Sequence, residues 1–340
     1  MSTLKLLHVL VRHGDRTNLE ECKYPNDPYL NETYEPVGIG KLTNLGKRRM
    51  YEVGRALRHQ YNEYLGDYKS EYLNAVASEL GRARNSLELI LAGLFPPSEE
   101  FIWMKGFNWQ PIPFHSNSGK DNLLGNPRRN CANWTQYYAE SHANFQDVMT
   151  NYSNYFDRLV EFTGWDRNLL SANLMYNSIT TNLAWGYELD ESLKEFWPEP
   201  TLTLNNIFWK AFTNTENTQI AGAGKFIDEL LEQITKKLMD SNMTKIHIYA
   251  GSDFNIMFLI RILGQEIFDN PPFGAHLIIE FHKNGEESFL QFFYRPNLDG
   301  PLLELKIPDC QAPASDGQMR CLFDDFLLTR IKFLPYPNYC

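Results

Sequence analysis

The chain has 340 residues, of which 43% are hydrophobic, and its formal net charge at pH 7 is -10. This length and composition allow one large core or two unequal ones, which excludes a disordered protein. Nucleic acids and anionic membranes need basic surfaces, so the acidic balance excludes both as partners and favours a small-molecule ligand. The N-terminal apolar run is too short for a membrane helix or a signal sequence and is broken by Lys5 and His8, which indicates a mature form.

The first predicted element is a buried strand over residues 6–11, which ends in a tight loop at Gly14. Arg12, His13 and Arg16 stand directly after it. Ligands of open α/β sheets bind at the carboxyl ends of strands. Two guanidinium groups, each a planar fork of donors, predict a phosphate or carboxylate site there, with His13 as nucleophile or ligand contact.

The next predicted elements are a helix around residues 47–57, a strand over 73–78 and a helix over 84–94. The arginines of the first helix are expected on its solvated face; they are Arg48, Arg49, Arg55 and Arg58. Arg82 follows the strand and either joins the first two arginines at the sheet edge or lies on the surface near a helix start. Arg84 is an alternative for the same role.

Residues 101–125 are rich in aromatic residues and proline and predict an irregular connection. Residues 137–193 are mostly helical and predict a separate lobe, whose aromatic stripe we interpret as packing. An amphipathic helix from Ala223 to Leu238 precedes a strand over 246–250, then Ser252 and Asp253, then a helix over 254–263. Serine or aspartate there either caps the helix or faces the ligand. Residues 275–282 and 288–295 predict a hairpin.

Five cysteines stand at positions 22, 131, 310, 321 and 340, and spacing alone does not determine their pairing. Glycosylation motifs begin at Asn31, Asn133, Asn151 and Asn242. Together these features favour an oxidising secretory compartment, and the alternative is a cytosolic protein with free thiols.

The motifs Arg12-His13-Gly14-Asp15-Arg16, Arg82 and Ser252-Asp253 resemble those of the histidine acid phosphatases, branch 2 of the histidine phosphatase superfamily. The resemblance continues in order through residues 42–46, 94–97, 109–113, 121–124 and 249–253, and the placement of 94–97 selects Arg82 over Arg84. It implies an α/β fold in which helices flank a mixed central β-sheet and a smaller helical cap domain is attached. Residues 1–125 and 205–340 would form the core domain, and residues 126–204 the cap.

The resemblance also implies roles for individual residues. His13 would attack a phosphomonoester to form a phosphohistidine, Asp253 would protonate the leaving alcohol, and the phosphoryl oxygens would be held by Arg12, Arg16 and Arg82. Disulfides would join Cys131 to Cys340 and Cys310 to Cys321, leaving Cys22 free. No metal or cofactor is expected, and the chain would be a monomer or homodimer.

Two residues depart from the family pattern, because Ser252 replaces a histidine and Asn18 replaces a proline. Loss of a charged donor at the first position typically costs about 10²–10³ in rate. The chain is similar to the salivary acid-phosphatase-like proteins of blood-feeding fleas, a group associated with sequestering biogenic amines such as serotonin, and leukotrienes. We therefore expect a secreted salivary protein with impaired phosphatase activity that binds such mediators in the former active-site cleft.

The ligand would contact Arg12, His13, Arg16, Arg82, Ser252 and Asp253. The first alternative is an active histidine acid phosphatase. The second is a secreted protein that has kept no ligand.

Overall fold

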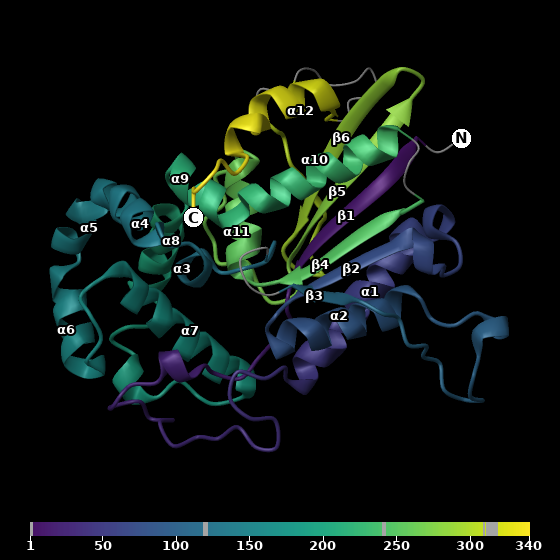
Figure 1. Ribbon diagram of the computed structural model, residues 1–340. Coiled ribbons are helices and arrows are strands. Elements are labelled where there is room, and N and C mark those ends of the chain that lie inside the picture. Colours follow the sequence, from purple (N-terminus) through teal and green to yellow (C-terminus); the bar gives the residue numbers. More distant parts are fainter. Residues whose placement is uncertain (1–2, 118–121, 240–242, 309, 311–318) are drawn as a thin grey trace.

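The computed structural model describes residues 3–117, 122–239, 243–308, 310 and 319–340. Within them a mixed sheet of eight strands runs through the body in the order β3-β2-β4-β1-β5-β6-β7, and β8 pairs with β6 (Figure 1). The strands are β1 (Leu4–Arg12), β2 (Leu73–Ser78), β3 (His115–Asn117), β4 (Ile246–Gly251), β5 (His276–Asn284), β6 (Glu287–Arg295), β7 (Leu303–Glu304) and β8 (Cys321–Leu322). The four strands from β3 to β1 are parallel, and the others pair antiparallel.

Helices cover both faces of this sheet, so the predicted mixed α/β fold is confirmed. One face packs on α1 (Asn44–Leu65) and α2 (Gly81–Leu94), and the other on α10 (Lys225–Leu238), α11 (Asp253–Ile262) and α12 (Phe323–Arg330). Side chains of β1 alternate between the faces, since Leu7 and Val9 join the first core and Leu6 and Leu10 the second.

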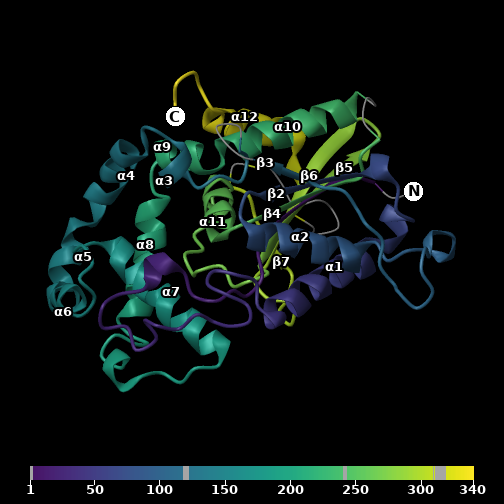
Figure 2. The ribbon, with the colours of Figure 1, turned by 60° about the horizontal axis from the view of Figure 1, so that its bottom comes forward.

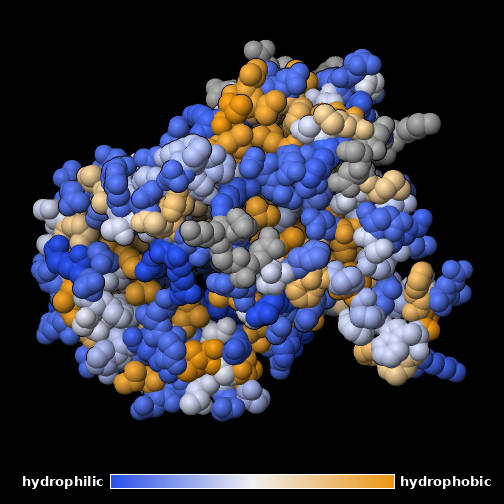
Figure 3. Space-filling model, in the orientation of Figure 1, coloured by the Kyte–Doolittle hydropathy of each residue, from blue (hydrophilic) through white to orange (hydrophobic). Residues whose placement is uncertain are grey.

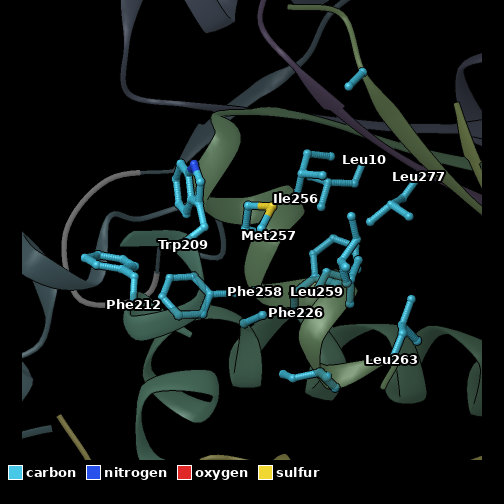
Figure 4. Packing of buried hydrophobic residues seen from close by; sticks show 14 of the residues in the cluster. Leu10, Trp209, Phe212, Phe226, Ile256, Met257, Phe258, Leu259, Leu263 and Leu277 are labelled. Carbon is cyan, nitrogen blue, oxygen red and sulfur yellow. The ribbon is translucent and has the colours of Figure 1, made fainter. Parts of the chain in front are cut away.

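A helical lobe extends from the sheet on the side of the C-terminus (Figure 1). Its helices are α3 (Pro127–Asn130), α4 (Trp134–His142), α5 (Gln146–Asn151), α6 (Ser153–Thr163), α7 (Leu169–Trp185), α8 (Thr201–Phe212) and α9 (Glu216–Gln219). Figure 4 shows the aromatic packing that joins lobe and body, with Phe212 of α8 beside Phe258 of α11 at 5.5 Å between ring centroids. This contact anchors α11, whose first turn carries Asp253.

The division into a core and a cap at residues 126 and 204 stays a prediction, and the packing adds two observations. The expected boundary after residue 204 falls inside α8. The segment 18–40, expected in the core, runs along the lobe (Figures 1 and 2). Its Tyr34 hydroxyl donates to Asn182 of α7 at 2.6 Å, and its Tyr29 stacks on Tyr187 at 4.4 Å.

Most predicted elements are found, with corrections at their ends and in one connection. The strand 73–78, the hairpin and the helix ending at Leu238 are confirmed. The helix predicted over 84–94 begins at Gly81, which places Arg82 in its first turn. The irregular connection predicted over 101–125 is wrong in part, because β3 extends the sheet there by parallel pairing with β2.

The same connection carries three exposed aromatic residues. Trp103, Phe107 and Trp109 contact one another, and each remains more than one-third exposed. Figure 3 shows this segment projecting from the body. No helix among the described residues is both long enough and apolar enough to cross a bilayer.

Both disulfides implied by the resemblance are present. Cys131–Cys340 ties the start of the lobe to the C-terminus, and Cys310–Cys321 closes a short loop. Cys22 is free and buried, and burial raises the pKa of its thiol to about 12. Cys22 is therefore a protonated thiol at physiological pH.

Candidate functional site

The predicted site residues meet at the carboxyl edge of the parallel strands. β1 and β4 pair so that Arg12 lies beside Gly251, and the next residues, His13 and Ser252, leave the sheet together. A cavity of about 350 Å³ opens at this edge. Five of the six predicted ligand contacts line it: His13, Arg16, Arg82, Ser252 and Asp253. The sixth, Arg12, lies behind them, where it pairs with Asp253.

His13 is held with one ring nitrogen directed to the backbone and the other to a guanidinium group. Nδ1 lies 2.9 Å from the carbonyl oxygen of Gly14, so Nδ1 carries the proton. Nε2 accepts a hydrogen bond from Arg82 Nε at 3.0 Å. Burial, followed by the charges of Arg82, Arg12 and Arg16, holds the pKa of His13 well below its ordinary value. His13 is therefore neutral, with its Nε2 lone pair on the side of the cationic site.

Arg12 is the most tightly fixed of the three arginines. Its Nη2 pairs with Asp253 Oδ2 at 2.8 Å, and its Nη1 donates to the carbonyl of Pro271. Its guanidinium carbon lies 4.1 Å from the ring centroid of Phe273, which is a cation–π contact. Arg12 consequently orients Asp253 and contributes positive charge from behind the cavity.

Arg16 and Arg82 line the cavity itself. Arg16 donates from Nη2 to Asn177 Oδ1 at 3.0 Å and from Nη1 to the Thr17 carbonyl at 3.1 Å. Burial and the charge of Arg16 lower the pKa of Arg82 to about 9. Asp253 and Glu21 offset part of the repulsion between these arginines, and a bound anion would offset more of it.

Ser252 caps α11, and Asp253 begins it. The backbone N–H of Ser252 donates to Asn255 Oδ1 at 2.8 Å, and its hydroxyl lies 3.2 Å from the same oxygen. Asp253 Oδ1 accepts from the N–H of Phe254 at 3.0 Å, while Oδ2 faces Arg12. The pair therefore caps the helix and also lines the cavity, and its contact with a ligand stays a prediction.

The expectation that Arg49 belongs to a solvated helix face is wrong. Arg49 donates two hydrogen bonds to the Asp15 carboxylate, from Nε to Oδ2 at 2.6 Å and from Nη2 to Oδ1 at 3.2 Å. Asp15 is 5% exposed and belongs to the loop between His13 and Arg16. A side chain at Gly46 would overlap the Asp15 backbone, so glycine lets α1 approach this loop closely. The start of α1 thus packs against residues 13–16 and stabilises the loop that carries His13 and Arg16.

Replacing Arg49 by alanine should lower the free energy of unfolding by about 1.5–3 kcal/mol, because it leaves the buried Asp15 carboxylate unpaired. Urea denaturation of the two proteins measures the change. Arg48→Ala, one residue earlier on the exposed surface, is the matched control and should stay within about 0.5 kcal/mol of the unmodified chain. Equal effects of the two substitutions would show that the Asp15 contact is not structural.

Some residues of the site were not predicted from the sequence. Phe273 packs against Arg12, Arg16 and the His13 ring, and Asn177 reaches Arg16 from the lobe. Phe273 follows Pro271 and Pro272, and such a pair indicates a turn but not a site residue. The rest of the cavity wall combines apolar, amide and charged side chains. The apolar and amide residues include Leu19, Leu80, Leu124, Leu170, Leu174, Trp209, Phe254, Asn122, Asn126, Asn130 and Asn173, and the charged ones are Glu20, Glu21, Glu79, Arg128 and Arg129.

Comparison with known proteins identifies the family. The sequence model of the histidine phosphatase superfamily (branch 2) matches residues 3–295. The venom acid phosphatase Acph-1 of Apis mellifera is 28% identical over 326 residues, covering 91% of this chain and 81% of that protein. The prostatic acid phosphatase of Bos taurus is 29% identical over 321 residues, covering 90% and 81%.

A solved structure shares the fold as well. The phytase of Hafnia alvei in complex with tartrate superposes with a TM-score of 0.70 at 16% identity, covering 99% of this chain and 98% of the phytase chain. At that identity the likeness concerns the fold alone. The family match over most of the chain carries the assignment: this protein belongs to branch 2 of the histidine phosphatase superfamily.

Proposed function

We propose that this protein binds and sequesters small mediators, biogenic amines such as serotonin and also leukotrienes, and that its phosphatase activity is impaired. The observation that carries the proposal is Ser252. Its neutral hydroxyl lies in the cap of α11 beside Asn255, where the resemblance places a histidine that would supply a charged donor. Losing one such donor typically costs about 10²–10³ in rate. The cavity and its arginines are still present in this chain. We therefore expect the cavity to bind a ligand but to hydrolyse a phosphomonoester slowly.

A leukotriene fits the chemistry of the cavity wall. Its carboxylate would lie against Arg16 and Arg82, whose guanidinium groups match the two oxygens. Its apolar chain would follow the lobe side, where Leu170, Leu174 and Trp209 line the cavity. Glu20, Glu21 and Glu79 also line the cavity and repel a carboxylate, so this placement depends on Arg16 and Arg82.

An amine at the same place is repelled by the arginines and attracted by Glu20, Glu21 and Glu79. Asp253 already pairs with Arg12, and the other two arginines repel a second cation. We therefore place an ammonium either over Asp253 on the side away from the arginines, or deeper, against aromatic side chains. Trp209 and Phe254 are the aromatic residues of the cavity wall.

Arg16→Ala should weaken leukotriene binding about tenfold or more, because a charge-assisted contact to the carboxylate is lost. Amine binding should change by less than about threefold, since the substitution also removes a repulsive charge. Calorimetric titration of both variants with serotonin and with a leukotriene gives the comparison, and Arg48→Ala serves as an exposed arginine control. Equal losses for the two ligands would contradict this placement.

An active acid phosphatase is the second candidate, and the state of His13 favours it. Nδ1 is bound to the backbone, so Nε2 carries the lone pair, which accepts from Arg82 and would have to leave that bond to attack; Asp253, paired with Arg12, lies at the same cavity. The acid phosphatase relatives support the same activity. Strong turnover of a chromogenic phosphomonoester by the unmodified chain would favour this candidate over impaired activity.

Secretion, and saliva as its destination, belong to the same proposal. Two disulfides support an oxidising compartment, and the relatives include a venom acid phosphatase. Asn31 and Asn151 are exposed as glycosylation requires. The Asn133 amide instead donates to the carbonyls of Asn338 and Tyr339, and Asn242 lies outside the described residues.

A further inference from the structure

Ser78 is the last residue of β2 and lies at the same sheet edge as the arginine site. β2 pairs in parallel with β4, with Ala77 beside Ala250, so Ser78 ends its strand close to the level of Ser252. Ser78 also lines the cavity that His13 lines. Three neighbouring parallel strands, β1, β4 and β2, therefore each bring a polar residue to one cavity.

The hydroxyl of Ser78 has no hydrogen-bond partner among the described residues, although Ser78 is only 3% exposed. Its backbone carbonyl is engaged, since it accepts from the Ser116 hydroxyl at 3.3 Å. Arg16 Nε is a second buried donor without a partner at the same cavity. Buried polar groups in native proteins are nearly always paired, because leaving one unpaired costs stability. Two unpaired donors at one cavity indicate a partner that the chain itself does not supply.

The shape of that partner follows from the donors already present. A guanidinium fork binds two oxygens in its own plane, so arginines can satisfy both oxygens of a carboxylate. A tetrahedral oxyanion such as phosphate has further oxygens outside that plane. We propose that the Ser78 hydroxyl donates to one of these oxygens and is an additional, neutral ligand contact that favours tetrahedral oxyanions over carboxylates. This inference rests on the anion site of the proposed function.

Calorimetric titration of the full chain with inorganic phosphate tests the contact. Ser78→Ala should raise the Kd for phosphate about tenfold, while the Kd for a leukotriene, a carboxylate, should change less than about twofold. The urea midpoint of Ser78→Ala should be equal to or higher than that of the unmodified chain, because the substitution removes an unpaired buried hydroxyl. Ser116→Ala, on the adjacent strand β3, is the matched control and should leave phosphate affinity unchanged.

The possible outcomes distinguish a failure of the Ser78 contact from a failure of the proposed anion site. An unchanged phosphate Kd in Ser78→Ala would overturn the contact and leave the anion site standing. Weaker phosphate binding with a lower urea midpoint would also overturn it, because that combination marks a structural serine. If the unmodified chain binds no phosphate, the anion site fails, and with it this contact and the placement of the leukotriene carboxylate.

Discussion

Ser252→His should raise kcat/KM for a chromogenic phosphomonoester at pH 5 by about 10²–10³. A protonated histidine at the start of α11 would face the cavity beside Asp253 and supply the charged donor that the serine lacks. The backbone N–H of residue 252 keeps its bond to Asn255 in the variant, so the helix stays capped. The other site residues are in place, since His13 Nε2 accepts from Arg82 at the cavity and Asp253 is paired with Arg12.

Two further variants make this result specific. Ser252→Ala removes the hydroxyl without adding a donor, so its turnover should stay near that of the unmodified chain. Ser252→His combined with His13→Ala should return to the background rate, because the nucleophile is gone. If the unmodified protein already turns over at the rate of the histidine variant, impaired activity is contradicted.

Lowering the pH from 7 to 5 should remove a large part of the free energy of unfolding. Burial lowers the pKa of His247 to about 3 and that of His276 to about 4, and the pKa of His8 also lies well below its ordinary value. In the unfolded chain these side chains titrate near pH 6.5. Below that pH the unfolded chain binds protons that the folded chain excludes. The contribution of these histidines to the free energy of unfolding is therefore complete above about pH 6.5. As the pH drops towards 4, each histidine lowers the free energy of unfolding by about 1.4 kcal/mol per pH unit.

His8 gives the sharpest test of this acid sensitivity. Its ring stacks on His247 at 4.6 Å between centroids, and neither of its nitrogens has a partner among the described residues. His8→Phe keeps a ring of similar shape without a titratable group, so it should reduce the loss of stability between pH 7 and pH 5. His59→Asn, at an exposed position, should not. Urea denaturation at several pH values gives the slope of the free energy of unfolding against pH for each protein. Identical slopes for His8→Phe and the unmodified chain would show that His8 does not cause the acid sensitivity.

The sheet and the strand-end residues were accessible from the sequence because each depends on local pattern. β1, β2 and β4 are apolar runs followed at once by polar residues, and parallel strands bring such ends together. β3 was not predicted because it has only three residues, none of them apolar. It is defined by its parallel pairing with β2, which the local sequence does not reveal. The disulfide pairing followed from the family resemblance, since spacing allows several connectivities.

The supports of the site were less accessible because they depend on contacts between distant segments. Helical periodicity assigns Arg49 to an outer face, yet the loop carrying Asp15 folds over that position. Phe273 and Asn177 reach the site from segments more than 150 residues from Arg12, and no local pattern marks them. Ser252 was ambiguous for a different reason, because a helix cap and a strand-end ligand site occupy the same residue.

Calorimetric titration of the unmodified protein with serotonin and with a leukotriene, at pH 7.5 where the buried histidines do not destabilise it, tests sequestration most directly. We predict saturable binding of both ligands, one molecule per chain, under conditions where phosphomonoester turnover is low. If neither ligand binds, the proposal is contradicted. The remaining alternative is then a secreted protein of this family that has kept no ligand.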